Sequence, residues 1–223
     1  MEKKIIRDII EVGRFLFEAG VVDYFAGNLS IKDSKGNIYI TRSGSPLPML
    51  KHQDVIKIPP RGIPLIEALK HLVSNSEKGI PFAGKPSSEF IVHRAVYEKT
   101  EHKAVAHAHP PTVVKVAFTF VDKGLPSTKG SFKFIPEDIP IVGIYTPRDS
   151  EAKLLLGEIP IVKVEKPSAS PELARAVSET LKERPCVIVY SHGVFCGGKT
   201  LKEAAGFITA LEFSARVFEP DVK

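Results

Sequence analysis

The first stretch of the chain carries apolar residues at helical spacing. Residues 2–19 place isoleucine, valine, phenylalanine and leucine three to four positions apart, and Gly20 follows as a left-handed stop, so a helix is predicted there. Two short apolar runs, 29–31 and 38–41, flank a turn that contains Gly36, which predicts a β-hairpin. The remaining pattern predicts strands at 55–58, 103–109, near 139–144, near 159–164, 186–190 and 194–196, and helices at about 87–99, 112–120, 170–183 and 200–218.

The alternation of element types points to one α/β domain. Helices and strands alternate without a repeat or a break in composition, so we expect a single domain over residues 1–223. Helices would cover both faces of a central sheet. The hairpin and the closely spaced runs at 186–196 favour a mixed sheet over a purely parallel one. The expected helix caps are Ser87 or Ser88, Ser170 with Pro171 at the first helical position, and Thr200.

Composition and charge exclude several classes of protein. The 223 residues are 43% hydrophobic and 26% charged, which is typical of a globular protein. The net charge of +5 is spread among acidic residues without a basic run, so no nucleic-acid partner is expected. No apolar stretch approaches the ~20 residues of a membrane span, so no membrane partner is expected. Charges interrupt the N-terminal apolar residues, so we predict no signal peptide and a cytoplasmic location.

Two cysteines, Cys186 and Cys196, are too few for a disulfide framework in a chain of this kind. Cys186 begins an apolar run and is interpreted as a small core residue. Cys196 lies four residues after a histidine and has an alternative as a thiolate metal ligand. We favour the structural interpretation for both.

Two apolar runs end in histidines. His107 and His109 stand two residues apart behind the run 104–106, and residues at this spacing on a strand point to the same face. His192 follows the run 187–190 and can supply a third imidazole from a neighbouring strand. Imidazole suits zinc, and three nitrogens leave a position open for substrate. These histidines therefore predict a catalytic zinc site.

The other four histidines are weaker candidates. His93 follows Glu89 by four residues on the predicted helix, so it can neighbour the site, although a structural role is favoured. His52, His71 and His102 fall in polar segments and are expected to be solvated.

Small polar residues gather in three segments that suit an anion. Ser87-Ser88 precedes a predicted helix, where free N–H groups bind phosphate, although an ordinary cap is the alternative. Gly27-Asn28-Leu29-Ser30 and Thr41-Arg42-Ser43-Gly44 offer further hydroxyl, amide and backbone donors.

A second phosphate motif is discounted. Residues 193–200 match the G-x-x-x-x-G-K-T string of nucleotide-binding loops. The interior residues Val194, Phe195 and Cys196 are apolar and typical of a strand, whereas a triphosphate needs a flexible cradle.

Together these residues resemble the class II aldolase/adducin family, most closely the L-fuculose-1-phosphate aldolases. The matching segments follow the family order along most of the chain: Gly27-Asn28-Leu29-Ser30, Thr41-Arg42-Ser43-Gly44, Ser87-Ser88-Glu89, His107-Ala108-His109-Pro110, Ser191-His192-Gly193 and Gly197-Gly198-Lys199-Thr200. The resemblance implies a three-layer α/β/α domain with a mixed, mostly antiparallel sheet, assembled as a homotetramer.

The resemblance also implies an activity. It implies a zinc-dependent aldolase that cleaves a ketose 1-phosphate into dihydroxyacetone phosphate and an aldehyde through an enediolate. Glu89 would act as the acid/base and as a zinc ligand in the resting enzyme. The implied zinc ligands are His107, His109, His192 and Glu89, one ion being bound per subunit. The implied sugar-phosphate pocket consists of Asn28, Ser43, Gly44, Ser87 and Ser88.

Other branches of the family remain alternatives. Epimerases usually carry Asp at the position of Glu89, and dehydratases usually place their glutamate after the histidine pair, where this chain has Glu137. Decarboxylases of sugar-acid phosphates share Ser-Ser-Glu. A non-enzymatic adducin-like module is disfavoured by the complete histidine set. Two positions depart from the family, Phe25 and Arg42, and Tyr145 is the candidate for the family's tyrosine proton donor.

Overall fold

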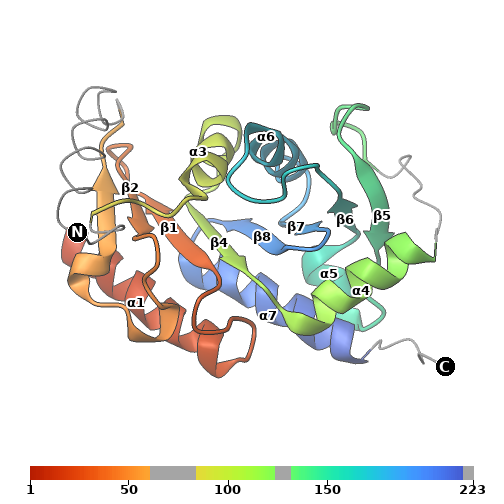
Figure 1. The fold of residues 1–223 in the computed structure, drawn as a ribbon, viewed down its shortest axis with the longest axis horizontal. Coiled ribbons are helices and arrows are strands. Elements are labelled where there is room, and N and C mark those ends of the chain that lie inside the picture. Colours follow the sequence, from red (N-terminus) through yellow and green to blue (C-terminus); the bar gives the residue numbers. More distant parts are fainter. Residues whose placement is uncertain (61–83, 124–131, 218–223) are drawn as a thin grey trace.

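The computed structural model describes residues 1–60, 84–123 and 132–217 of the chain. Eight strands form one sheet in the order β3-β2-β1-β4-β8-β7-β6-β5 (Figure 1). The strands are β1 (Asn28–Lys32), β2 (Ile38–Thr41), β3 (Val55–Ile58), β4 (Ala104–Ala108), β5 (Ile141–Tyr145), β6 (Ile159–Val162), β7 (Cys186–Val189) and β8 (Gly193–Gly198). The helices are α1 (Glu2–Glu18), α3 (Phe90–Lys99), α4 (Pro111–Asp122), α5 (Ser150–Leu156), α6 (Pro171–Thr180) and α7 (Leu201–Val217), with short 3-10 turns at Leu47–Met49 and His52–Asp54.

Strand pairing confirms a mixed, mostly antiparallel sheet. Among the described strands, only β6 and β7 pair in parallel, and the other neighbours are antiparallel. The centre of the sheet is β4, which pairs with β1 on one side and β8 on the other.

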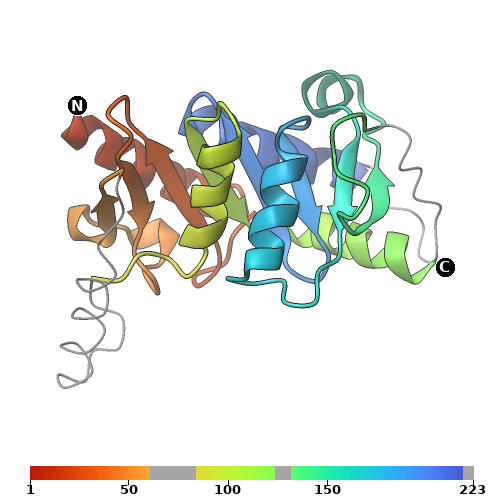
Figure 2. The same cartoon turned by 90° about the horizontal axis from the view of Figure 1, so that it is seen from above.

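Helices cover both faces of the sheet, as predicted. The side chains of Ala104, Ala106 and Ala108 face a core shared with α1, α4, α5 and α7. Val105 belongs to the opposite core, shared with α3 and α6. Figure 1 shows the two helix layers on either side of the sheet, and Figure 2 shows α3 and α6 side by side over one face. The three-layer α/β/α prediction is confirmed.

The predicted caps are found at two helices and displaced at a third. Ser170 Oγ accepts from Leu173 N at 3.0 Å, and Thr200 Oγ1 accepts from Glu203 N at 3.1 Å. Helix α3 instead begins at Phe90 with Glu89 at the cap position, and the Glu89 side chain makes no capping bond.

One helix was not predicted from the sequence. Helix α5 has seven residues, too few to show a clear period, and the Asp149 carboxylate starts it by accepting from Ala152 N at 2.8 Å. None of the described helices is both long and apolar enough to span a bilayer.

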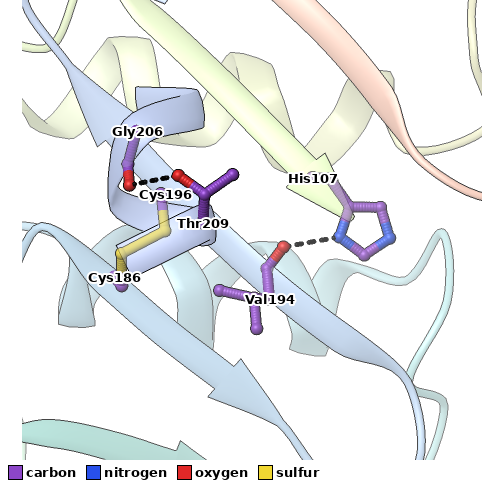
Figure 3. The surroundings of a disulfide bond; sticks show 6 residues. All are labelled: His107, Cys186, Val194, Cys196, Gly206 and Thr209. Atoms are coloured by element: carbon purple, nitrogen blue, oxygen red, sulfur yellow. Dashed lines mark hydrogen bonds between the residues drawn. A yellow bond between two sulfur atoms is a disulfide. The ribbon is translucent and has the colours of Figure 1, made fainter. Parts of the chain in front are cut away.

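The expectation of two unpaired cysteines was wrong. Cys186 on β7 and Cys196 on β8 are register partners and form a disulfide, with an S–S distance of 2.13 Å (Figure 3). Antiparallel pairing places their Cβ atoms opposite one another, which a sequence separation of 10 does not reveal. Both residues are fully buried, so the core interpretation holds and Cys196 is not available as a metal ligand.

Candidate metal centre and anion pocket

The predicted site residues converge on one pocket of about 200 Å³. It lies where β4 ends, beside the start of β1, the β7–β8 turn and the segment that leads into α3. Its lining includes every candidate residue, namely Asn28, Ser43, Gly44, Ser87, Ser88, Glu89, His107, His109 and His192, together with Phe25, Arg42 and Ser168 among others. Segments far apart in the sequence are therefore brought together as the motifs predict.

The three histidines form a compact cluster. His107 Nε2 and His109 Nε2 lie 2.9 Å apart, and one ring nitrogen from each of the three histidines falls within 4.8 Å of the others. The His192 ring lies 4.7 Å from the His107 ring and 4.9 Å from the His109 ring, measured between centroids. Ring nitrogens at this separation can share one metal ion.

Contacts with β8 fix the orientation of the His107 ring. Its Nδ1–H donates to the carbonyl oxygen of Val194 on β8 at 2.9 Å (Figure 3), so its Nε2 carries the free lone pair. The ring is stacked on Phe195 at 4.0 Å between centroids. A metal-ligating histidine usually has such a support.

Burial keeps the cluster neutral. It holds the pKa of His107 well below the ordinary 6.5, and the neighbouring imidazoles of His109 and His192 lower that pKa further. Burial, followed by the charge of His192, lowers the pKa of His109 to about 4. Burial also lowers the pKa of His192, although Glu89 opposes this. Neutral imidazoles near pH 7 are the form that binds a metal ion.

Glu89 faces the histidines from the start of α3. The side chain is 4% exposed, and Oε1 lies 3.9 Å from His192 Nε2. Oε1 also accepts from Ser168 Oγ at 2.8 Å and from the backbone N–H of Ala169 at 3.1 Å. Oε2 is buried and has no hydrogen-bond partner within the part of the chain that the structure describes. A buried carboxylate oxygen without a partner fits a fourth ligand position or a proton-transfer role.

The anion side of the pocket is built from three loops. Gly44 has φ 74°, a conformation that favours glycine, and Ser43 N donates to Lys85 O at 3.0 Å. Ser87 and Ser88 lie immediately before α3, where helix N–H groups attract negative charge. Arg42 also lines this side, although its guanidinium donates to the Asp54 carboxylate at 2.5 Å.

Two glycines allow close approach around the histidines. A Cβ atom on Gly27 would lie 2.8 Å from His107 O, and the residue has φ 88°. A Cβ atom on Gly193 would collide with Ala108 O and lie 2.7 Å from Cδ2 of His109. Side chains at either position would displace the histidine cluster.

Several sequence candidates lie elsewhere. Tyr145 is buried in the core, where its hydroxyl bonds Ser214, so the tyrosine prediction was wrong. Glu137 is exposed and does not line the pocket. Residues 193–198 form β8 rather than a phosphate loop. His102 is half-buried with Nε2 bonded to Leu181 O, rather than solvated. His52 is exposed as predicted, and His71 lies outside the described residues.

Two residues that bond to members of the candidate site were missed or undervalued in the sequence. Ser168 lies two residues before the Ser170 cap and carries no motif of its own. Its approach to Glu89 depends on Ala169, which adopts the left-handed conformation at φ 51°. His93 is fully buried and bonds Asn28, for which the only sequence signal is its spacing from Glu89.

Comparison with known proteins identifies the family. Residues 7–218 match the family described as Class II Aldolase and Adducin N-terminal domain, and the chain belongs to this family. Its fold is the class II aldolase fold, as the solved L-fuculose-1-phosphate aldolase from Thermus thermophilus illustrates. The TM-score to that structure is 0.75 at 27% identity, covering 97% of this chain and 93% of the other.

Curated relatives carry out other reactions on the same family scaffold. The methylthioribulose-1-phosphate dehydratase of Sulfurihydrogenibium sp. (strain YO3AOP1) is 26% identical over 202 residues, which cover 89% of this chain and 81% of the relative. The 3-oxo-tetronate 4-phosphate decarboxylase of Haemophilus influenzae is 26% identical over 211 residues, which cover 94% of this chain and 84% of the relative. The family is thus established, and its members differ in reaction.

Proposed function

We propose that this chain is a zinc-dependent lyase that cleaves a ketose 1-phosphate, similar to L-fuculose 1-phosphate, into dihydroxyacetone phosphate and an aldehyde. The observation that carries the proposal is the position of Glu89. Among the described residues that line the pocket it is the sole carboxylate, and it faces the three histidines. A carboxylate there can transfer a proton at a substrate carbon held beside the cluster.

His107, His109 and His192 would hold the ion, with Glu89 as a ligand in the resting state. Three neutral imidazoles and a carboxylate suit zinc, and the buried, unpartnered Oε2 of Glu89 supports a fourth donor. When bound, zinc supplies Lewis-acid stabilisation of the negative charge that develops on substrate oxygen. Elemental analysis of purified protein is expected to find about one zinc per chain.

Glu89 would move the proton that aldol cleavage requires. When the bond between C3 and C4 of a ketose breaks, the C4 hydroxyl loses its proton as the aldehyde forms, the electron pair of the bond stays on C3, and C3 must then receive a proton. Ser168 Oγ and Ala169 N hold Oε1 of Glu89, which restricts the carboxylate, and Oε2 has no hydrogen-bond partner among the described residues. A carboxylate fixed in this way can return the proton to one carbon atom.

The phosphate of the substrate would occupy the loops around α3. Ser43, Ser87 and Ser88 offer hydroxyls, Gly44 offers a backbone amide, and Asn28 offers a side-chain amide. The helix N-terminus adds a favourable field for a dianion. These donors favour a sugar phosphate, rather than a free sugar, as the substrate.

A second candidate is dehydration of a ketose phosphate such as methylthioribulose 1-phosphate, which the name of a curated relative favours. Glu89 would then remove a proton next to the carbonyl group, and water would leave from the neighbouring carbon. Decarboxylation of a sugar-acid phosphate, suggested by the second relative, and epimerisation remain as further reactions on this scaffold. Each reaction gives different products.

The test is a product assay on zinc-loaded protein. L-Fuculose 1-phosphate and related ketose 1-phosphates are offered with and without a chelator, and dihydroxyacetone phosphate is measured by a coupled enzyme. Chelator-sensitive release supports the aldolase. If zinc-loaded protein releases none, and instead dehydrates methylthioribulose 1-phosphate or releases carbon dioxide from 3-oxo-tetronate 4-phosphate, the aldolase proposal is overturned.

We also propose that four copies assemble, as the family resemblance implies. Large apolar side chains are exposed on three helices of the α1/α7 layer: Phe15 and Phe17 on α1, Leu154 and Leu155 on α5, and Phe213 and Val217 on α7. Exposed apolar side chains of this size support an interface between copies. Light scattering of the purified protein is expected to give about four times the 24.4 kDa chain mass.

A further inference from the structure

A series of buried hydrogen bonds leads from the interior of α3 to the pocket wall. The Tyr97 hydroxyl lies 2.7 Å from Ser30 Oγ, which lies 2.7 Å from His93 Nδ1. His93 Nε2 in turn lies 2.6 Å from Asn28 Oδ1. His93 and Ser30 are completely buried, and Tyr97 is 5% exposed. The proposed reaction uses Asn28 and gives no role to the other three residues.

The hydrogens in this series can be placed. Burial lowers the pKa of His93 to about 3, so the imidazole is neutral and has one N–H and one lone pair. Asn28 Oδ1 can only accept, so Nε2 carries the hydrogen and donates to it. Nδ1 then accepts from the Ser30 hydroxyl, and Ser30 accepts from Tyr97. Each donor therefore points along the series toward Asn28.

The place of His93 is also fixed by packing. Its ring and that of Phe195 pack edge to face at 6.2 Å between centroids, and the same phenylalanine stacks on His107. Asn28 pairs with His107 across β1 and β4. His93 is thus part of the wall that separates the metal cluster from the core, and it contacts the pocket through Asn28 alone among the described hydrogen bonds.

We propose that His93 is a positioning residue that fixes the side-chain amide of Asn28 with its N–H donors toward the anion pocket. Because Oδ1 is held by His93, the opposite end of the amide, Nδ2, is left for the ligand. A phosphate dianion accepts hydrogen bonds, so Nδ2 attracts it, whereas Oδ1 in that place would repel it. This inference rests on the proposed function, in which Asn28 contacts the substrate phosphate.

Two substitutions of His93 test the roles of its two ring nitrogens separately. His93→Gln can place an amide N–H near the position of Nε2, because both nitrogens lie two bonds beyond Cγ, so the donor to Asn28 is retained. His93→Asn reaches only the position of Nδ1, so it can accept from Ser30 but leaves Asn28 Oδ1 free. Both variants keep the three clustered histidines, so any contribution of zinc to anion binding is common to both.

The measurement is binding of inorganic phosphate to the zinc-loaded protein by calorimetry. The wild type and His93→Gln are expected to agree within about threefold, and His93→Asn is expected to bind roughly 10-fold more weakly, the scale of one hydrogen bond to a charged group. Zinc content is expected to be equal in all three. Equal phosphate affinity in all three proteins, or equal loss in both variants, would overturn the role of His93. Absence of binding by the wild type would instead overturn the phosphate pocket and, with it, this inference.

A measurement on the wild type covers the case of a variant that does not fold. Nitrogen-15 NMR of histidine-labelled protein distinguishes the two neutral tautomers, and the signal of His93 is assigned by its loss in either folded variant or by its bonded neighbours. We expect hydrogen on Nε2 and a lone pair on Nδ1. Hydrogen on Nδ1 would reverse the direction of the series and turn the Asn28 amide over, which contradicts the proposal.

Discussion

At the scale of single residues, the two carboxylate oxygens of Glu89 differ in their hydrogen bonding. Oε1 receives two hydrogen bonds from the segment before α6, and Oε2 is buried with no partner in the described ranges of the chain. An acceptor without a donor is costly in a folded protein unless a ligand or a proton completes it. The carboxylate is therefore prepared for a partner that binds in the pocket.

Substitution of Glu89 tests directly whether this carboxylate takes part in the reaction. Glu89→Gln is expected to retain zinc through the three histidines and to lower kcat by at least ~10²-fold, the usual scale for a general acid or base. Zinc is measured by elemental analysis and kcat by the product assay. Glu137→Gln, at an exposed carboxylate away from the pocket, is the matched control and is expected to keep full activity. Near-normal turnover of Glu89→Gln would remove Glu89 from the mechanism.

Ser168 gives a second test at this scale. Ser168→Ala removes the 2.8 Å hydrogen bond to Glu89 Oε1 and leaves the bond from Ala169 N in place. We expect kcat to fall about 10-fold at unchanged zinc content, because one hydrogen bond to a charged group is lost. Ser168→Thr keeps the hydroxyl and is expected to recover most of the activity. Loss of zinc from Ser168→Ala would show a role in metal binding instead.

At the scale of elements, local patterns predicted what lies within one segment. The i, i+2 spacing of His107 and His109 was sufficient to place both imidazoles together, because a strand fixes the direction of alternate side chains. The capping role of Ser170 followed from Pro171 beside it. Such features need no knowledge of the partner elements.

Features that depend on register between distant strands were not predictable from a single sequence. The Cys186–Cys196 bond requires the pairing of β7 with β8, and the contact of Ser168 with Glu89 requires α6 to lie beside α3. The link from His93 to Asn28 joins α3 to β1. Family resemblance gave the residues of the candidate site but not these supports.

The disulfide gives a prediction for the β7–β8 pair. It closes a segment with a sequence separation of 10 residues, for which loop-closure entropy suggests about 2–3 kcal/mol of stabilisation. The double variant Cys186→Ala, Cys196→Ala is therefore expected to unfold at lower denaturant concentration than the wild type. Reductant is expected to shift only the wild type. Two titratable thiols in denatured, unreduced protein would contradict the bond.

At the scale of the whole molecule, the buried histidines make stability depend on pH. The pKa of His93 falls from its ordinary 6.5 to about 3 on folding, so below pH 6.5 the unfolded chain binds more protons than the native one. The free energy of unfolding of zinc-free protein is thus expected to decrease as pH falls from about 6.5 toward 3, by up to ~1.4 kcal/mol per pH unit for this residue. His109, with a pKa of about 4, adds to the same trend.

Denaturant unfolding of chelator-treated protein between about pH 7 and about pH 4 measures this dependence. His93→Gln removes one titrating group and is expected to flatten the slope relative to the wild type. His52→Gln, at an exposed position, is the control and is expected to leave the slope unchanged. A wild-type stability that is constant over this range would contradict the burial of neutral imidazoles.

The pairing of β4 with β8 at the centre of the sheet bears on how the chain folds. It joins segments far apart in the sequence, and it brings His107 beside the turn that carries His192. Contacts of long sequence separation form late, because the entropy of closing a large loop must be overcome first. The three histidines are therefore brought together only after the central strands meet. In a refolding experiment, uptake of metal from a coloured indicator would time the closure of the sheet.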